Sequence, residues 1–221
     1  MFKVIAAGGG GEEDSRLIDQ VFVSLAGKEK KTLYTPIALD GAARPYQDCY
    51  KWMKSVYEPL GLGDIELCVD LKLAAQSNMM DYSAVYIGGG NTFKLLKIFK
   101  ETGFDKVLKE FIQNGGVVYG GSAGAIILGK DIMTCAYLDE NGVGLEKFSG
   151  LDCFKGYSIW CHYELRNDTL VNKYIEMNKF PVVAIPEKAG ILFDGDKIKV
   201  FGYEPCYLFD GKKKETIMPE N

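Results

Sequence analysis

Histidine is the residue this chain has least of: there is one in 221 residues, and the six cysteines form no C-x-x-C pair. Zinc sites and thiol-disulfide redox motifs need clusters of these residues, so the sequence argues against both kinds of site. Basic residues are not in excess either, because 26 Lys and Arg stand against 30 Asp and Glu for a formal net charge of -4. That balance argues against a general nucleic-acid binder.

Long hydrophobic runs are also missing. The uncharged stretch 111–129 approaches membrane-spanning length, but six of its 19 residues are Gly, which favours a buried strand and turn. The N-terminus passes from a short apolar run straight into acids and lacks the long apolar region and cleavage site of a signal peptide. We therefore expect a cytoplasmic protein that acts without a membrane.

The overall composition is that of a folded globular protein. Hydrophobic residues make up 47% and charged residues 25% of the chain, and 221 residues can bury a substantial core. No internal repeat, low-complexity segment or linker divides the sequence. We expect a single domain over residues 1–221; the sequence gives no indication of its oligomeric state.

Short apolar runs alternate with longer amphipathic ones through the first 130 residues, which is typical of strand-helix-strand units. The pattern predicts an α/β fold, a mostly parallel sheet with helices on both faces. Predicted strands lie near 2–7, 32–39, 65–70, 84–87 and 117–119, and predicted helices near 12–26, 45–60, 92–101 and 104–114. Further strands near 158–163 and 182–185 flank a helix near 167–178.

The C-terminal part has the signals of β-hairpins. Turn residues at 194–196 and at 210–211 separate short apolar runs. The lysines at 212–214 that follow are expected to form a solvated sheet edge without a partner.

Three predicted strands are followed by glycine-rich turns, at 8–11, 88–90 and 120–121. Ligands of open parallel sheets bind beyond the carboxyl ends of the strands, so these turns are candidate sites. The first turn resembles a phosphate loop only superficially, because Glu13 stands where the third glycine of the dinucleotide fingerprint belongs. Acids at 12–14 would also repel a phosphate, so we predict a tight strand-to-helix turn there.

The third turn contains the pattern G-x-S-x-G, with Ser122 at its centre, between an apolar strand and an apolar helix. This context is the one a nucleophile elbow requires. Small neighbours expose the hydroxyl, and the N-terminus of the following helix directs N–H groups at developing negative charge. The pattern also arises by chance in glycine-rich turns, but here it makes Ser122 the candidate nucleophile.

A serine nucleophile needs a base, and His162 is the one histidine available. A lone histidine is more often structural, but its place at the end of a predicted strand favours the catalytic interpretation. A carboxylate should orient the imidazole and stabilise its cation. Glu187, at the end of the strand near 182–185, and Asp139, in the loop after the serine helix, are both candidates.

The middle turn supplies possible oxyanion donors. Glycines lack side chains, so the N–H of Gly89 or Gly90 can approach a substrate carbonyl together with the N–H of Ala123. Asn91 completes the turn as a further substrate-binding candidate, or simply caps the next helix. This chemistry requires no metal or organic cofactor.

These motifs carry a family resemblance. The segments VYIGGGNTFKLL and GGVVYGGSAGAIILG, followed by CHY and then IPE, resemble the peptidase E family of serine peptidases. Those aspartyl dipeptidases are relatives of cyanophycinase within the class I glutamine amidotransferase-like fold. The resemblance covers most of the chain and implies an exopeptidase-like hydrolase of small peptides. It implies Ser122 as nucleophile, His162 as base, and Gly89 and Ala123 as oxyanion donors.

The remaining site residues follow from the same resemblance. The family's third relay member has been assigned both to a glutamate after the strand that follows the histidine and to an aspartate between serine and histidine. Glu187 matches the first and Asp139 only loosely matches the second, so Glu187 ranks ahead. Beyond His162 the chain departs from the family, whose further His and G-E-T-R segment help to recognise the substrate's aspartate. Arg166 is the cation nearby and the candidate to bind an acidic group.

Two other functions are compatible with these residues. An amidase or esterase acting on a non-peptide substrate would use the same triad. A protein that kept the fold while losing catalysis would bind small molecules without turnover.

Overall fold

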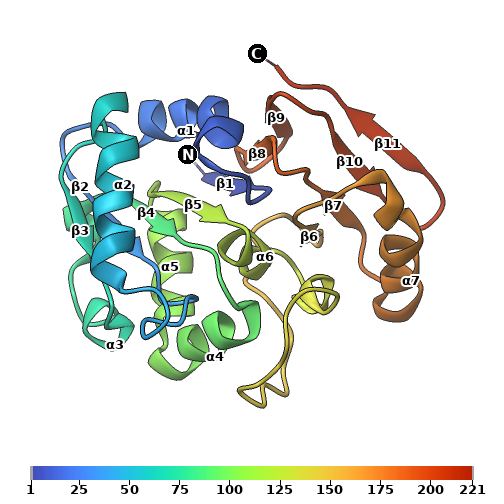
Figure 1. Cartoon of the computed structure of the whole chain (residues 1–221), viewed down its shortest axis with the longest axis horizontal. Coiled ribbons are helices and arrows are strands. Elements are labelled where there is room, and N and C mark those ends of the chain that lie inside the picture. Colours follow the sequence, from blue (N-terminus) through green and yellow to red (C-terminus); the bar gives the residue numbers. More distant parts are fainter. Residues whose placement is uncertain (1, 221) are drawn as a thin grey trace.

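The computed structural model describes residues 2–220 and is built around a seven-stranded sheet (Figure 1). The strand order is β3-β2-β4-β5-β1-β8-β9. The strands are β1 (Lys3–Ala7), β2 (Lys31–Thr35), β3 (Ile65–Leu67), β4 (Tyr82–Ile87), β5 (Val117–Gly121), β8 (Ala189–Phe193) and β9 (Ile198–Gly202). Strands β1 to β5 pair in parallel, whereas β8 and β9 run antiparallel. The predicted mostly parallel sheet is confirmed.

Helices cover both faces of this sheet. Because successive strand residues point to opposite sides, β1 contributes to two cores. Ile5 of β1 packs in one core with residues of α1 (Glu12–Ala26) and α2 (Tyr46–Leu60). Its neighbour Val4 packs in the other core. The helices around that second core are α3 (Leu71–Ala74), α4 (Thr92–Thr102), α5 (Phe104–Gln113) and α6 (Ala123–Leu128).

A smaller four-stranded sheet lies at the right of Figure 1, in the order β11-β10-β7-β6. It consists of β6 (Ser158–Trp160), β7 (Val182–Ala184), β10 (Cys206–Phe209) and β11 (Lys214–Ile217), and α7 (Asp168–Asn178) packs with it. The two C-terminal hairpins are therefore present, but β8–β9 extends the large sheet and β10–β11 extends the small one. The sequence pattern did not predict this division.

Two expectations need correction. The strand expected over 32–39 ends at Thr35, because Pro36 has no N–H with which to continue the ladder. The lysines at 212–214 do lie at an exposed sheet edge, as expected, but Lys214 was expected to have no partner there. It forms an ion pair with Asp168 at 2.9 Å and lies over the ring of Tyr207 at 4.4 Å from its centroid.

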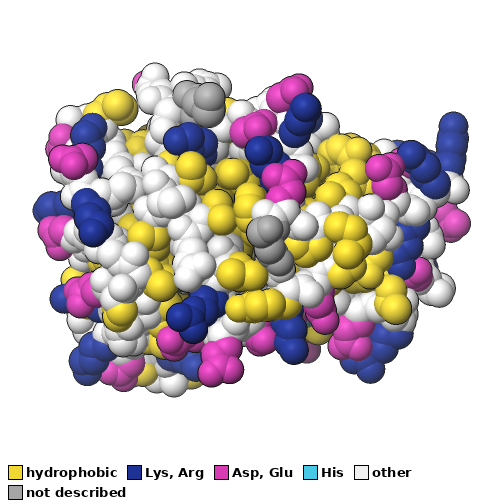
Figure 2. All heavy atoms as spheres, turned by 90° about the horizontal axis from the view of Figure 1, so that it is seen from above, with side chains coloured by type: hydrophobic (Ala, Val, Ile, Leu, Met, Phe, Trp, Pro, Cys, Tyr) yellow, Lys and Arg dark blue, Asp and Glu magenta, His cyan; other side chains and the backbone are white. Residues whose placement is uncertain are grey.

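Within residues 2–220, no helix is both long and apolar enough to cross a bilayer. On the face shown in Figure 2, acidic and basic side chains are interspersed around apolar areas.

Candidate active site

The three glycine-rich turns come together at one edge of the large sheet. They follow β1, β4 and β5, which are parallel neighbours with β5 in the middle. The carboxyl ends of parallel neighbours meet at the same edge, which is where open α/β sheets bind ligands. Ser122 follows β5 and therefore lies between the other two turns.

Ser122 occupies a sharp strand-to-helix turn with φ 51° and ψ -114°, a strained backbone conformation for a residue with a side chain. The glycines on either side make this turn possible. A Cβ at Gly120 would lie 2.4 Å from the Gly124 carbonyl oxygen, and one at Gly124 would lie 2.3 Å from the Ile87 carbonyl oxygen. Glycine is thus required at both positions, as the G-x-S-x-G pattern predicts.

His162 is held beside this serine by backbone hydrogen bonds on each side. Its own N–H donates to the Gly8 carbonyl at 3.0 Å, and the N–H of Tyr163 donates to the Ile185 carbonyl at 3.1 Å. His162 also has a left-handed backbone, with φ 52°. This geometry directs its ring at Ser122, with 2.9 Å between Ser122 Oγ and His162 Nε2.

The carboxylate partner of His162 is Glu187, whose Oε1 lies 2.9 Å from His162 Nδ1. With the proton on Nδ1, the ring donates to Glu187 and leaves Nε2 free to accept from the serine hydroxyl. The Oδ2 of Asp139, the alternative candidate, instead accepts a hydrogen bond from the Thr92 N–H at 2.8 Å. The structure thus brings Ser122, His162 and Glu187 together, while their roles in a reaction stay a prediction.

The middle turn lies against the other side of the serine. A Cβ at Gly89 would lie 3.1 Å from Ser122 Cβ, and one at Gly90, where φ is 137°, would lie 2.4 Å from the Ala38 carbonyl carbon. Ala123 is the first residue of α6, so its N–H has no partner within that helix. Asn91 is the N-cap of α4, where its Oδ1 accepts from the Lys94 N–H at 2.9 Å.

Sequence reasoning missed the part that the first glycine turn plays. Gly9 has φ 102°, and a Cβ there would lie 2.4 Å from Cε1 and 2.7 Å from Nε2 of His162. A Cβ at Gly10 would lie 2.5 Å from the Glu187 carbonyl oxygen. The turn is tight, as predicted, and its backbone also packs against the His162 ring. Its position at the end of a parallel strand was the one signal available.

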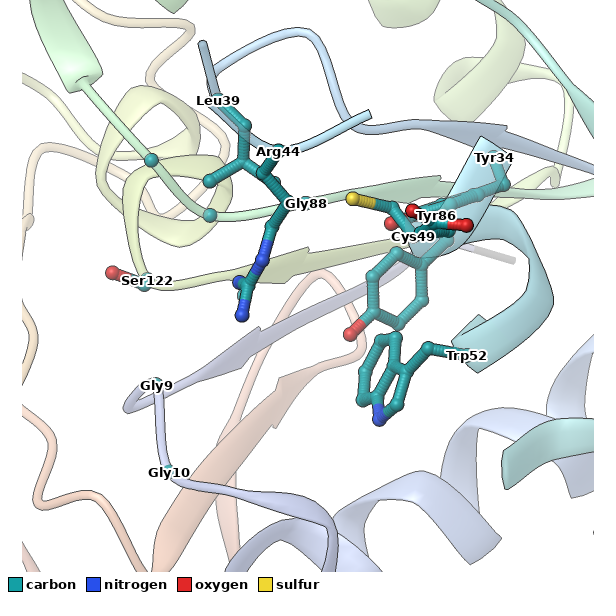
Figure 3. A pocket seen from close by; sticks show the side chains of 14 residues that line it. Gly9, Gly10, Tyr34, Leu39, Arg44, Cys49, Trp52, Tyr86, Gly88 and Ser122 are labelled. Atoms are coloured by element: carbon teal, nitrogen blue, oxygen red, sulfur yellow. The ribbon is translucent and has the colours of Figure 1, made fainter. Parts of the chain in front are cut away.

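A cavity of about 550 Å³ opens beside Ser122 between the first glycine turn, at Gly9 and Gly10, and the middle turn, at 88–90 (Figure 3). Its lining combines glycine backbone with aromatic side chains, among them Tyr34, Trp52 and Tyr86, and one cation, Arg44. Figure 3 shows the Arg44 guanidinium extending into the cavity. His162 and Glu187 are not part of the lining.

Arg44 has no anionic partner among the described residues. Asp48, which also lines the cavity, is paired with Lys51 at 3.0 Å. Burial raises the pKa of the Cys49 thiol and of the Tyr34 phenol, outweighing the opposing field of Arg44. Both groups are therefore neutral at physiological pH, so the charged side chains that line this cavity are Arg44 and Asp48, the latter paired with Lys51.

Arg166 does not occupy the position expected for the substrate-binding cation. It belongs to a 3-10 turn, Leu165–Asn167, its side chain is 78% exposed, and it pairs with Glu164 at 2.8 Å. The cation that lines the cavity is Arg44. Nothing in the sequence around Arg44 indicated this, because the residue lies in an irregular loop between β2 and α2.

Comparison with known proteins adds family and fold. The sequence profile of peptidase family S51 matches residues 4–201. The chain is 29% identical over 143 residues to Peptidase E of Shewanella denitrificans, covering 62% of this chain and 61% of that protein. It is 32% identical over 139 residues to the uncharacterized peptidase YgaJ of Bacillus subtilis, covering 57% and 56%. The matches thus span less than two thirds of the length of these curated relatives.

Two solved structures share the fold. One is a protein from Listeria monocytogenes EGD-e, provisionally named a peptidase E, with a TM-score of 0.72, 21% identity, and coverage of 92% of this chain and 100% of that one. The other is a peptidase from an acI-B1 Actinobacterium, with a TM-score of 0.69, 17% identity, and coverage of 100% and 96%.

Proposed function

The chain belongs to peptidase family S51, and from this premise we propose that it is a serine-dependent exopeptidase of small peptides, with Ser122, His162 and Glu187 as its relay. One observation carries the proposal: two hydrogen bonds of 2.9 Å link the serine hydroxyl, the imidazole and the carboxylate in series. Such a series activates a hydroxyl that is otherwise a weak nucleophile.

Acylation follows from this geometry. Ser122 Oγ attacks the peptide carbonyl carbon while its proton passes to His162 Nε2, and Glu187 stabilises the imidazolium through Nδ1–H. The carbonyl oxygen becomes an oxyanion, which the N–H groups of Gly89 and Ala123 receive. His162 then gives its proton to the leaving amine as the C–N bond breaks, which leaves an acyl ester on Ser122.

Deacylation repeats the same steps with water. His162 Nε2 takes a proton from the water as its oxygen attacks the ester carbonyl, and the oxyanion again lies against Gly89 and Ala123. Collapse breaks the bond to Ser122 Oγ, which recovers its proton from His162. The products are an amino-terminal fragment with a new carboxylate and the amine released before.

We assign the cavity to the acyl part of the substrate. The leaving amine must lie next to His162, which protonates it, so the acyl part extends to the opposite side of Ser122. The cavity of about 550 Å³, whose lining includes the middle turn but neither His162 nor Glu187, is of a size for a small ligand. Arg44 favours an acyl group that carries a carboxylate, and Trp52 and Tyr86 supply apolar walls.

The same relay on a non-peptide amide or ester is the second candidate, and a fold that has lost turnover is the third. We place the protein in the cytoplasm, a location with which its six buried free thiols are compatible.

The test is hydrolysis of a dipeptide panel by the wild type and Ser122→Ala, with acidic, neutral and basic amino-terminal residues and matched amides and esters. We expect cleavage of peptides, fastest with an acidic first residue, and a loss of several orders of magnitude in Ser122→Ala. Cleavage of non-peptide amides or esters alone would reassign the substrate. No serine-dependent turnover, together with no acyl adduct on Ser122 by mass spectrometry, would overturn the proposal.

A further inference from the structure

Asp139 lies between the serine and the histidine in sequence, yet its carboxylate faces the middle glycine turn. Its Oδ2 accepts from the N–H of Thr92, the first residue of α4, at 2.8 Å. The carbonyl of the next residue, Glu140, accepts from Asn91 Nδ2 at 2.9 Å. Two consecutive residues of this loop therefore bind the end of the turn.

Both ends of the turn are also bound by the last residue of β2 and the segment that follows it. The Gly88 N–H donates to the Thr35 carbonyl at 2.9 Å, and the Asn91 N–H donates to the Ala38 carbonyl at 3.0 Å. The turn is thus held between two segments that are distant in sequence. Gly89, between these attachments, is the residue that lies against Ser122.

The hydrogen bonds leave a specific set of donors free. Within residues 2–220, the N–H groups of Gly89 and Gly90 donate no hydrogen bond. The Thr92 N–H is one of the unpaired donors at the N-terminus of α4, and the Asp139 carboxylate satisfies it. The partial positive charge of the helix N-terminus further favours a carboxylate there.

We propose that Asp139 is a positioning residue that fixes the Gly89 N–H as an oxyanion donor. This inference rests on the proposed function, hydrolysis through Ser122. Because the oxyanion forms only in the transition state, loosening the turn lowers kcat with little change in KM.

Two substitutions separate the positioning role from a relay role. Asp139→Asn keeps an oxygen that can accept from the Thr92 N–H, whereas Asp139→Ala removes it. We expect kcat to fall roughly 10- to 100-fold in Asp139→Ala, in the range of a weakened oxyanion donor. Asp139→Asn should recover most of that loss, and the acid limb of the pH profile should stay in place in both variants, because Glu187 still pairs with His162.

A relay carboxylate would behave in the opposite way. Asp139→Asn would then be as inactive as Asp139→Ala. The acid limb would also move to lower pH, since the imidazolium would have lost its counter-charge. That result would overturn the proposal.

A second readout does not depend on turnover. Amide hydrogen exchange and chemical shifts can be followed at Thr92, Gly89 and Gly90 in the wild type and in both Asp139 variants. Asp139→Ala should speed exchange at Thr92 and shift both glycine signals, whereas Asp139→Asn should do so much less. Unchanged signals in Asp139→Ala would contradict the proposal. An inactive wild type with these changes would count against the peptidase proposal alone.

Asp70 provides the matched control. It caps α3 by accepting from the N–H groups of Lys72 at 2.9 Å and Leu73 at 3.1 Å, and it does not line the active-site cavity. Asp70→Ala should leave kcat unchanged. An equal loss of kcat in Asp70→Ala would show that Asp139→Ala acts through general destabilisation, and the proposal would fail.

Discussion

The two sides of Ser122 are built from different kinds of groups. On the histidine side, which consists of the turn 8–11, His162 and Glu187, titratable side chains form a hydrogen-bonded series. On the glycine side, which consists of the turn 88–91, Ala123 and Arg44, the groups nearest Ser122 belong to the backbone, and the cavity lies between the two glycine turns. Proton transfer is thus separated from charge stabilisation, so the two sides should respond differently to mutation and pH.

The largest effect should come from the histidine side. Glu187→Gln keeps the size of the side chain but removes the charge that stabilises the His162 imidazolium. We expect kcat/KM to fall on the order of 10²- to 10⁴-fold, with the acid limb of its pH profile moved to lower pH. Steady-state kinetics over a pH series would measure both changes. A loss confined to KM would contradict the separation of the two sides.

A steric change on the same side should have the next largest effect. Gly9→Ala places a methyl carbon 2.4 Å from Cε1 of the His162 ring, at a backbone φ of 102° that alanine disfavours. We expect activity to fall roughly 100-fold, because a displacement near 1 Å at a reacting group costs about that much. Gly11→Ala is a matched control, since the nearest side-chain atom to a Cβ there is 3.9 Å away. Equal losses in both variants would mean that the turn acts through its flexibility and not through contact with the histidine.

The glycine side should control substrate choice. Arg44→Ala should lower kcat/KM about tenfold for peptides with an acidic first residue, which is the value of one partly exposed charge-assisted hydrogen bond, and leave neutral peptides nearly unchanged. Arg166→Ala should change neither, because that side chain points to solvent and pairs with Glu164. If Arg166→Ala lowered kcat/KM for acidic peptides and Arg44→Ala did not, Arg166 and not Arg44 would be the substrate-binding cation.

The sequence predicted features that depend on residues close together in the chain better than contacts between residues far apart in it. Local patterns located α1 at the residues observed and placed Ser122 in its turn, because hydrophobic periodicity and glycine requirements act over a few residues. The contact between Gly9 and His162 joins positions 153 residues apart, the difference between 162 and 9, and no local pattern encodes it. Arg44 was missed for the same reason.

The carboxylates show the limit most clearly. Glu187 follows β7 of the small sheet and Asp139 follows the 3-10 turn Met133–Cys135, and residue type alone fits either as the partner of His162, although the family resemblance ranks Glu187 ahead. The three-dimensional arrangement separates them by contact, because Glu187 meets the imidazole and Asp139 meets the first amide of α4.

The smallest expected effect concerns the small sheet that supports the histidine side. Tyr163, next to His162, donates a hydrogen bond to Asp168, and Lys214 Nζ donates to the Tyr163 hydroxyl at 2.7 Å and to Asp168 Oδ2 at 2.9 Å. Lys214→Met should reduce the free energy of unfolding by about 1 kcal/mol, the scale of a partly exposed ion pair with a cation-π contact. It should leave kcat nearly unchanged, because Tyr163 keeps its backbone bond to Ile185. Lys213→Met, which removes an exposed pair with Glu215, is the control with almost no expected change.

The pH dependence of stability sharpens this prediction. Burial raises the pKa of Asp168, but the hydrogen bonds from Tyr163 and Lys214 outweigh it and lower that pKa below its ordinary value of 3.8. A carboxyl with a lowered pKa in the folded state stabilises the protein above its unfolded pKa and loses that contribution as the pH falls through the folded one. The difference in denaturant midpoint between the wild type and Lys214→Met should therefore be constant from neutral pH to about pH 5 and shrink below about pH 4. A large loss of kcat in Lys214→Met at constant stability would instead mean that the small sheet helps to orient His162 and belongs to the histidine side.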